Sequence, residues 1–270
     1  MTVKGRVSAA IAEGMAADVT GWNLDRFGDR MTTTSPPWDY RELVDGAVSA
    51  APGSLLDMGT GGGEWLADWL SSRRDAPCSR VVATESWPAN VPVAAGRLAP
   101  LGVTVLRTDG ALDNVDQGPS DRSGLLPFQA GSFDVVINRH ESYRAREIRR
   151  ILRPGGLFVT QQVVAGEEDL HRLLDLPVPQ ECRWTLRYAV DQAAEGGLTV
   201  LDAGVGTDLT TYHDVAPLVW YLRQVPWAVP GFDPKRDVER LRAVQERIDR
   251  FGPVPVRRSY FWLRATRRSS

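Results

Sequence analysis

A run of glycines directly after a short apolar segment places the strongest constraint on how this chain folds. Residues 54–58 read SLLDM, residues 59–63 read GTGGG, and a helix-forming segment begins at Glu64. Glycine is needed where the backbone turns sharply and where a ligand approaches the main chain. A strand, a glycine loop and a helix in succession are typical of the edge of a parallel sheet that binds nucleotide-like ligands. The residues expected to contact such a ligand are Asp57, Gly59, Thr60, Gly61 and Gly63.

From this loop onward, short apolar runs alternate with helical segments, which indicates βαβ units. Strands are predicted at residues 54–58, 80–84, 104–107, 133–138, 156–164, 198–204 and 260–265. Helices are predicted at residues 64–72, 91–101, 143–152, 167–174, 186–195, 215–224 and 234–250. Residues 32–37 are rich in turn formers. The predicted fold class is α/β, with a doubly wound, mostly parallel sheet of seven strands.

The length of 270 residues fits one large domain. We expect a helical lead-in over residues 1–50, a ligand-binding core over residues 51–165, and further strands with a helical insert on the substrate side over residues 166–270. The alternation of strands and helices continues past residue 165, so residues 1–270 are interpreted as a single domain.

Composition excludes several classes of protein. The formal net charge is -2, so the chain as a whole has no strong attraction to nucleic acid or to an anionic membrane. No apolar stretch is long enough to span a bilayer, and the N-terminal residues lack the apolar core of a signal peptide. The two cysteines, Cys78 and Cys182, lie far apart and suggest neither a disulfide framework nor a metal site. We expect a cytoplasmic protein without a metal.

Acidic residues follow the next two predicted strands. Glu85 ends the second strand and is suited to accept hydrogen bonds from ribose hydroxyls, with Ser86 beside it. Asp109 ends the third strand and is suited to accept a proton from an adenine amine, and the small Gly110 and Ala111 let a base lie flat. Glu85 suits a nicotinamide dinucleotide as well as a methyl donor. However, Glu64 stands where the dinucleotide fingerprint requires its third glycine.

Two later segments add a family resemblance. Residues 126–136, LPFQAGSFDVV, and residues 147–156, EIRRILRPGG, resemble the class I S-adenosylmethionine-dependent methyltransferase family in its small-molecule, type 11-like branch. The resemblance covers about residues 50–165. It implies that Asp57 and the glycines hold the methionine end of S-adenosylmethionine, Glu85 the ribose and Asp109 the adenine.

The end of the fourth predicted strand is the best place to look for chemistry. Residues 138–143 read NRHESY, at the crevice that faces the transferred methyl group. Asn138 is expected beside the cofactor, His140 is a candidate general base, and Glu141 is a candidate to orient it or to bind a substrate amine. Methyl transfer depends mainly on proximity and alignment, so the interpretation we favour for His140 is a place in the pocket without a chemical role.

Aromatic residues are frequent in the lead-in and in the tail. Packing in the core explains most of them. A sharper hypothesis is that the lead-in and the tail insert roof the active site and bind a flat or cationic acceptor. The residues expected in this substrate pocket are Trp38, Tyr40, Tyr143, His213 and Trp220.

These observations predict an enzyme that transfers a methyl group from S-adenosylmethionine to an O or N atom of a small molecule. One alternative is an RNA or protein methyltransferase. Another is a cofactor-binding partner subunit without catalytic activity, and a nicotinamide oxidoreductase is a distant third. The acceptor and the oligomeric state are not indicated by any motif.

Overall fold

The computed structural model describes residues 3–20, 24–73, 78–115, 123–164, 167–179 and 183–269, and these form one sheet of eight strands. The strands are β1 (Met31–Thr33), β2 (Ser54–Met58), β3 (Arg80–Glu85), β4 (Thr104–Arg107), β5 (Phe133–Arg139), β6 (Leu152–Val163), β7 (Thr199–Tyr212) and β8 (Val254–Thr266). Their spatial order is β1-β7-β8-β6-β5-β2-β3-β4.

The half of the sheet from β6 to β4 is parallel. β2 pairs with β3 on one side and with β5 on the other, while β3 continues to β4 and β5 continues to β6. The chain therefore progresses outward in opposite directions from the β2–β5 pair. In doubly wound folds, ligands bind outside the carboxyl ends of the strands at such a switch point.

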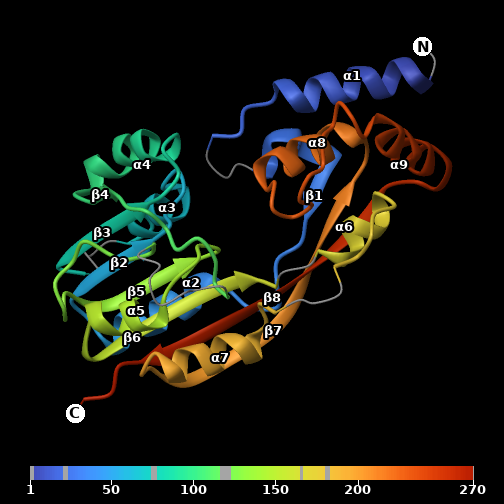
Figure 1. Ribbon diagram of the computed structural model, residues 1–270. Helices are drawn as coiled ribbons and strands as arrows, with labels where there is room; N and C mark the ends of the chain where they lie inside the picture. The colour runs from blue at the N-terminus through green and yellow to red at the C-terminus, as the bar shows by residue number, and fades with distance from the viewer. Residues whose placement is uncertain are drawn as a thin grey trace.

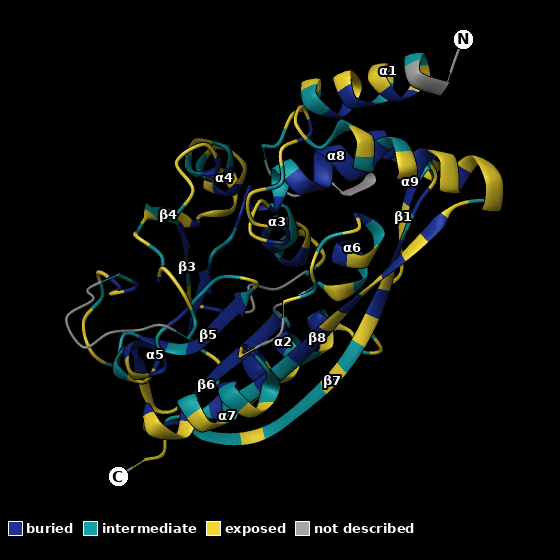
Figure 2. Cartoon of the chain, turned by 45° about the vertical axis from the view of Figure 1, so that its right-hand side comes forward, coloured by how far each residue is buried: buried dark blue, intermediate teal, exposed yellow. Residues whose placement is uncertain are grey.

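Helices cover both faces of this parallel half. They are α2 (Tyr40–Ala50), α3 (Glu64–Ser71), α4 (Asn90–Leu98), α5 (Ala145–Ile151) and α7 (Leu186–Glu195), with a short 3-10 turn η2 (Ala99–Leu101) after α4. Leu55 and its strand neighbours pack against α2, α3 and α4, whereas Leu56 packs in the cluster that contains α5 and α7. Successive strand residues point to opposite faces, so both faces of β2 are buried. In Figure 2, β5 is also drawn almost entirely as buried.

The other half of the molecule is built on β7 and β8. These two strands pair antiparallel from Thr199 and Thr266 to Tyr212 and Val254, well past Val163, where β6 ends. A separate apolar cluster covers the far part of this ribbon. It contains residues of α1 (Val3–Ala16), α6 (Glu168–Leu173), α8 (Val215–Gln224) and α9 (Val238–Phe251), beside the 3-10 helix η1 (Leu24–Arg30). Figure 1 shows α1, α8 and α9 together at the upper right, with β7 and β8 running diagonally toward them.

The mostly parallel α/β class is confirmed, and the strand count and the orientation of the last strands are corrected. β8 runs antiparallel to β6 and to β7, and β1 adds an eighth strand antiparallel to β7. β1 includes Thr32 and Thr33, which lie within the turn-rich stretch at residues 32–37. The prediction that residues 1–270 form a single domain stays a prediction, which the continuity of β7 and β8 through both halves supports. Among the helices that are described, none combines the length and the hydrophobicity needed to cross a bilayer.

Candidate functional site

The glycine loop after β2 adopts a conformation that other residues rarely reach. Gly59, Gly61 and Gly63 have φ angles of 72°, 63° and 78°, in the left-handed region that glycine enters without a steric penalty. The backbone N–H groups of Gly59 and Thr60 donate to the carbonyl of Thr84 at 3.0 and 2.9 Å, which ties the loop to the end of β3. The loop therefore presents bare backbone at the switch point of the sheet.

Asp57 lies one residue before the end of β2 and is only 6% exposed. Burial raises the pKa of its carboxyl group to about 6, while the Thr60 side chain and the positive charge of Arg139 act in the opposite direction. A carboxylate in this position attracts a cationic group at the edge of the sheet.

Glu85 ends β3 and fastens two loops together. Its Oε2 accepts a hydrogen bond from the Gly61 N–H at 2.6 Å, and its Oε1 accepts one from the Trp87 N–H at 2.8 Å. The side chain is buried, and this burial raises the pKa of the carboxyl group. A carboxylate offers about four lone-pair positions, so Glu85 retains the capacity to accept hydroxyl groups of a ligand.

Residues just after β4 form the next side of the site. Asp109 is exposed, whereas Ala111 is buried. Gly110 lies so close to Glu141 that a Cβ atom at this position would overlap its Oε1, and it would lie 3.4 Å from Ser86 Cβ. The ends of β3, β4 and β5 therefore converge on the same space.

Asn138 is fully buried at the end of β5 and is surrounded by protein groups. Its Oδ1 accepts hydrogen bonds from Thr160 Oγ1 at 2.9 Å and from Gln162 Nε2 at 2.6 Å. Its Nδ2 donates to the carbonyl of Glu141 at 3.1 Å. Because these partners use the side chain on both ends, Asn138 holds the turn that follows β5.

Glu141 reaches from this turn across the glycine loop. Its Cβ and Cγ atoms lie directly over Gly59, and its carboxylate is hydrogen-bonded with the Ser86 side chain. Burial and the nearby charge of Glu85 raise the pKa of Glu141 to about 7, against the effect of Ser86. Three carboxyl groups, those of Asp57, Glu85 and Glu141, therefore gather at one edge of the sheet.

His140 occupies a strained position beside this edge, with a φ angle of 68°. Its backbone N–H donates to the carbonyl of Gln161 at 2.9 Å, and its ring meets the ring of Tyr260 at 5.7 Å. The residue is exposed to solvent, but surrounding protein and the positive charges of Arg139 and Arg258 lower its pKa to about 3. A neutral imidazole with this pKa is a weak base near neutral pH.

Trp38 from the lead-in approaches the same turn. Its Nε1–H donates to Gln161 Oε1 at 2.7 Å. A Cβ atom on Gly206 of β7 would lie 2.5 to 2.7 Å from the rings of Pro37 and Trp38, so the bare glycine is what lets the lead-in lie against β7.

Tyr40 opens α2 on the other side of the β5 end. Its ring lies 5.0 Å from the ring of Trp65, and the guanidinium of Arg139 lies 5.7 Å from each ring. The arrangement places a positive charge beside two aromatic side chains and near Asp57.

Four residues of this environment were not among the predicted site residues. They are Trp65, Arg139, Gln161 and Tyr260. Two of them could have been found from the sequence, because Trp65 directly follows Glu64 at the start of the helix after the glycine loop and Arg139 directly precedes His140. Gln161 and Tyr260 reach the site only through the pairing of β6 with β5 and β8.

Three predicted pocket residues lie elsewhere, so we correct their assignment. Tyr143 is fully buried beneath the site, where its ring packs on Phe158 at 5.0 Å. Trp220 is 1% exposed in the separate cluster on the ribbon, and its Nε1–H donates to the carbonyl of Asp18. His213 is exposed at the far end of β7. Tyr143 and Trp220 are therefore packed in two apolar cores.

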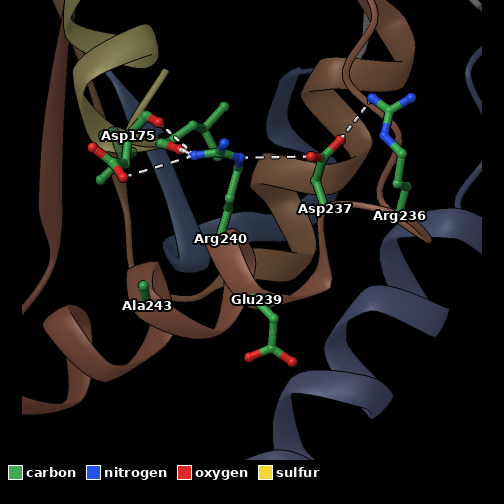
Figure 3. A pocket seen from close by; sticks show the side chains of 8 residues that line it. Asp175, Arg236, Asp237, Glu239, Arg240 and Ala243 are labelled. Atoms are coloured by element: carbon green, nitrogen blue, oxygen red, sulfur yellow. Dashed lines mark hydrogen bonds and ion pairs between the residues drawn. The ribbon is translucent and has the colours of Figure 1, made fainter. Parts of the chain in front are cut away.

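A pocket of about 390 Å³ lies between α6 and the start of α9, and Figure 3 shows that charged side chains line it. Arg240 donates to the carbonyl of Leu174 at 2.9 Å and lies 3.6 Å from Asp237, which also pairs with Arg236 at 3.1 Å. Its lining residues come from the ribbon half of the molecule. It is therefore separate from the carboxyl ends of β2 to β5.

The residues at the sheet edge fit S-adenosylmethionine. The glycine loop gives close access to the backbone, and three carboxyl groups suit a ligand with cationic groups and ribose hydroxyls. They do not suit the doubly anionic pyrophosphate of a dinucleotide. In addition, Glu64 starts α3 at the loop and pairs with Arg97 at 2.7 Å. The fold and the site define a class I S-adenosylmethionine-dependent methyltransferase.

Comparisons with known proteins agree with this class. Residues 56–160 match the family model described as Methyltransferase domain, Methyltransf_11, so this part of the chain is similar to that family of methyltransferases. The chain is thus an enzyme of this class, and its cofactor is S-adenosylmethionine. No curated protein matches it.

Solved structures match the fold. The YcgJ protein from Bacillus subtilis is 18% identical with a TM-score of 0.54, and the match covers 85% of this chain and 98% of that one. A putative methyltransferase from Bacillus halodurans C-125 is 15% identical with a TM-score of 0.52, over 86% of this chain and 99% of that one. At these identities the likeness establishes the fold alone.

Proposed function

We propose that this methyltransferase transfers the methyl group to an O or N atom of a small-molecule acceptor in the cytoplasm. The observation that carries the proposal is the group of side chains beside the end of β5. Trp38, His140 and Tyr260 come from three distant segments and meet next to the glycine loop. Aromatic faces with a few polar atoms are typical of pockets for small organic molecules.

The residues around the glycine loop are assigned to the cofactor. Asp57 and the main chain of residues 59–63 would hold the methionine end, Glu85 the ribose and Asp109 the adenine. Arg139 carries a positive charge at the methionine end, where it suits a carboxylate. The bound cofactor supplies a methyl group that is already activated by a sulfonium charge.

The remaining task of the chain is to align the acceptor with the methyl group. Holding two reactants in line removes much of the entropic barrier to a displacement, so no covalent participation by the protein is required. The pKa of about 3 for His140 argues against strong general-base catalysis by this residue. Glu141 lies with its carboxylate over the loop, where it is suited to contact a cationic or hydroxyl-bearing group.

Calorimetry tests the cofactor half of the proposal. Binding of S-adenosylhomocysteine and S-adenosylmethionine without binding of NAD is the expected result, and failure to bind either sulfur compound would overturn it.

A transfer assay tests the acceptor half. The enzyme is incubated with methyl-labelled S-adenosylmethionine and either a small-molecule extract, total RNA or denatured protein. Label recovered in small molecules supports the proposal. Label recovered in RNA or protein would replace it by the macromolecular alternative, and cofactor binding without transfer to any pool would favour a non-catalytic partner subunit.

A further inference from the structure

A chain of hydrogen bonds runs from the lead-in to the ring of His140. Trp38 Nε1 donates to Gln161 Oε1 at 2.7 Å, and Gln161 Nε2 lies 3.3 Å from His140 Nε2. Gln161 belongs to β6 and pairs in register with Arg139, so its side chain stands beside the turn that contains His140. The three side chains come from separate parts of the sequence, and the fold alone brings them together.

The chemistry of the first residue fixes the direction of the whole chain. An indole Nε1–H is a donor only, so the Gln161 atom facing Trp38 must be the carbonyl oxygen. The amide nitrogen of Gln161 then faces His140, and an amide NH₂ group is a donor only. His140 Nε2 must therefore accept, because an N–H at this atom would point at another N–H.

The surroundings of His140 favour the same protonation state. Arg139 and Arg258 are the charged groups that act on the ring, and both are positive, so they oppose an imidazolium. Tyr260 meets the ring edge to face. Nδ1 has no hydrogen-bond partner among the described residues, and His140 is exposed to solvent.

We propose that Trp38 and Gln161 lock His140 as the neutral tautomer with its proton on Nδ1, and that His140 thereby presents a hydrogen-bond donor to the methyl acceptor. The second half rests on the proposed function. In this assignment Trp38 and Gln161 are positioning residues. His140 takes no proton through Nε2, because that lone pair is already used.

The proposal restricts the class of acceptor. An Nδ1–H donor suits an acceptor oxygen that is already deprotonated and negatively charged, such as that of a carboxylate or a phenolate. A neutral alcohol would need a base, and His140 does not supply one because its Nε2 lone pair is already used.

Long-range ¹H–¹⁵N correlation spectra of the ¹⁵N-histidine-labelled protein test the tautomer directly, without cofactor or acceptor. The chain has three histidines, and the His140→Asn variant identifies the signals of His140. A protonated Nδ1 and an unprotonated Nε2 at pH 7 are expected. A protonated Nε2 or an imidazolium at that pH would overturn the proposal, whether or not the protein transfers methyl groups.

Two variants test the relay, with exposed His213 as an internal control in the same spectra. In Gln161→Glu, a carboxylate accepts from both neighbours, so the His140 proton should move to Nε2 and its pKa should rise. In Trp38→Phe, the ring remains against Gly206 but the donor is lost, so Gln161 can turn over and both tautomers should be populated. An unchanged His140 in both variants would show that the relay does not set the tautomer.

Turnover separates a donor from a base. Asparagine tolerates the left-handed backbone of His140 and offers an N–H donor, but it cannot accept a proton as a base. His140→Asn should therefore retain at least a tenth of the wild-type kcat, while His140→Ala should lose about a hundredfold. Equal loss in the two variants would remove the donor role, and the spectra would still decide the tautomer.

Discussion

The side chain of Glu141 lies against the bare Cα of Gly59, with its Cβ and Cγ atoms in the space that any larger residue at position 59 would need. This contact joins the end of β5 to the loop after β2, which are the two strands at the switch point of the sheet. The glycine is therefore required twice, for its φ angle of 72° and for the close approach of Glu141.

Replacing this glycine separates the two requirements. Gly59→Ala should lower the free energy of unfolding by about 2–4 kcal/mol, since a left-handed alanine costs roughly 1–2 kcal/mol and the overlap with Glu141 adds to it. Binding of S-adenosylhomocysteine should weaken at least tenfold. Gly102→Ala is the matched control, because Gly102 has a φ angle of 73° and nothing within 4 Å of a Cβ. Denaturant unfolding and calorimetry should show a larger loss at position 59, and equal losses would contradict the contact.

The raised pKa of Glu141 predicts a dependence of stability on pH. The folded protein binds this proton more tightly than the unfolded chain, because the pKa rises from about 4.5 to about 7 on folding. The contribution of Glu141 to stability is therefore fully present below pH 4.5 and is lost as the pH rises through 7. Glutamine at position 141 cannot ionise, so the Glu141→Gln variant should be more stable than the wild type at pH 8 by about 1–2 kcal/mol. This value is smaller than the full effect of the pKa shift because the side chain is partly accessible to solvent.

The same comparison at pH 4 should show almost no difference. Glu246→Gln changes an exposed carboxylate on α9 and serves as the matched control. A Glu141→Gln variant whose stability relative to wild type is the same at both pH values would show that Glu141 is not desolvated by this site.

Glu85 and Asp109 should respond differently although both are assigned to the cofactor. Glu85→Gln places an amide NH₂ against the N–H of Gly61 or of Trp87, which should cost about 1–3 kcal/mol of stability as well as cofactor affinity. Asp109→Asn changes an exposed side chain, so stability should stay within about 0.5 kcal/mol while the affinity for S-adenosylhomocysteine decreases about tenfold. Melting temperature and calorimetry on each variant measure the two effects. The assignment would be contradicted if Asp109→Asn lost stability. It would also be contradicted if Glu85→Gln lost neither stability nor cofactor affinity.

The elements of the cofactor half could be predicted from local patterns. The strand at residues 54–58, the strand at residues 104–107 and the helix at residues 186–195 have the expected bounds. The hydrophobic periodicity of these elements and the turn residues beside them depend only on residues close together in the sequence. The positive φ angles of the loop follow in the same way, since only glycine is at ease in them.

The ribbon and the acceptor side could not be predicted in this way. Strand β1 exists because Met31 pairs with Tyr212, and β7 and β8 extend past their predicted ends because they pair with each other. Such pairing depends on residues far apart in the sequence. Aromatic composition gave no means to separate Trp38, beside the turn after β5, from Trp220 in a core. The partner of the His140 ring, Gln161, likewise depends on strand register.

Two Arg–Asp ion pairs between β7 and β8 have the same bidentate geometry but differ in how far their side chains are buried. Arg258 donates to both oxygens of Asp208 at 3.0 and 2.6 Å, and Arg264 donates to both oxygens of Asp202 at 2.9 and 2.6 Å. The side chains of the first pair are 10% and 3% exposed, whereas those of the second are 31% and 40% exposed. Tyr260 Oη also donates to Asp208, at 2.7 Å.

Removing the acid from each pair should therefore give unequal results. Asp208→Ala leaves a buried guanidinium without its partner and should cost about 3–5 kcal/mol, whereas Asp202→Ala should cost at most about 1 kcal/mol, since water screens the exposed pair. Urea unfolding of both variants measures the difference. Because Asp208 also anchors the hydroxyl of Tyr260, whose ring meets His140, Asp208→Ala should in addition shift the ring signals of His140, and Asp202→Ala should leave them in place. Similar costs for the two variants would show that the buried pair does not stabilise the ribbon. Unmoved His140 signals in Asp208→Ala would show that the pair does not support the acceptor side.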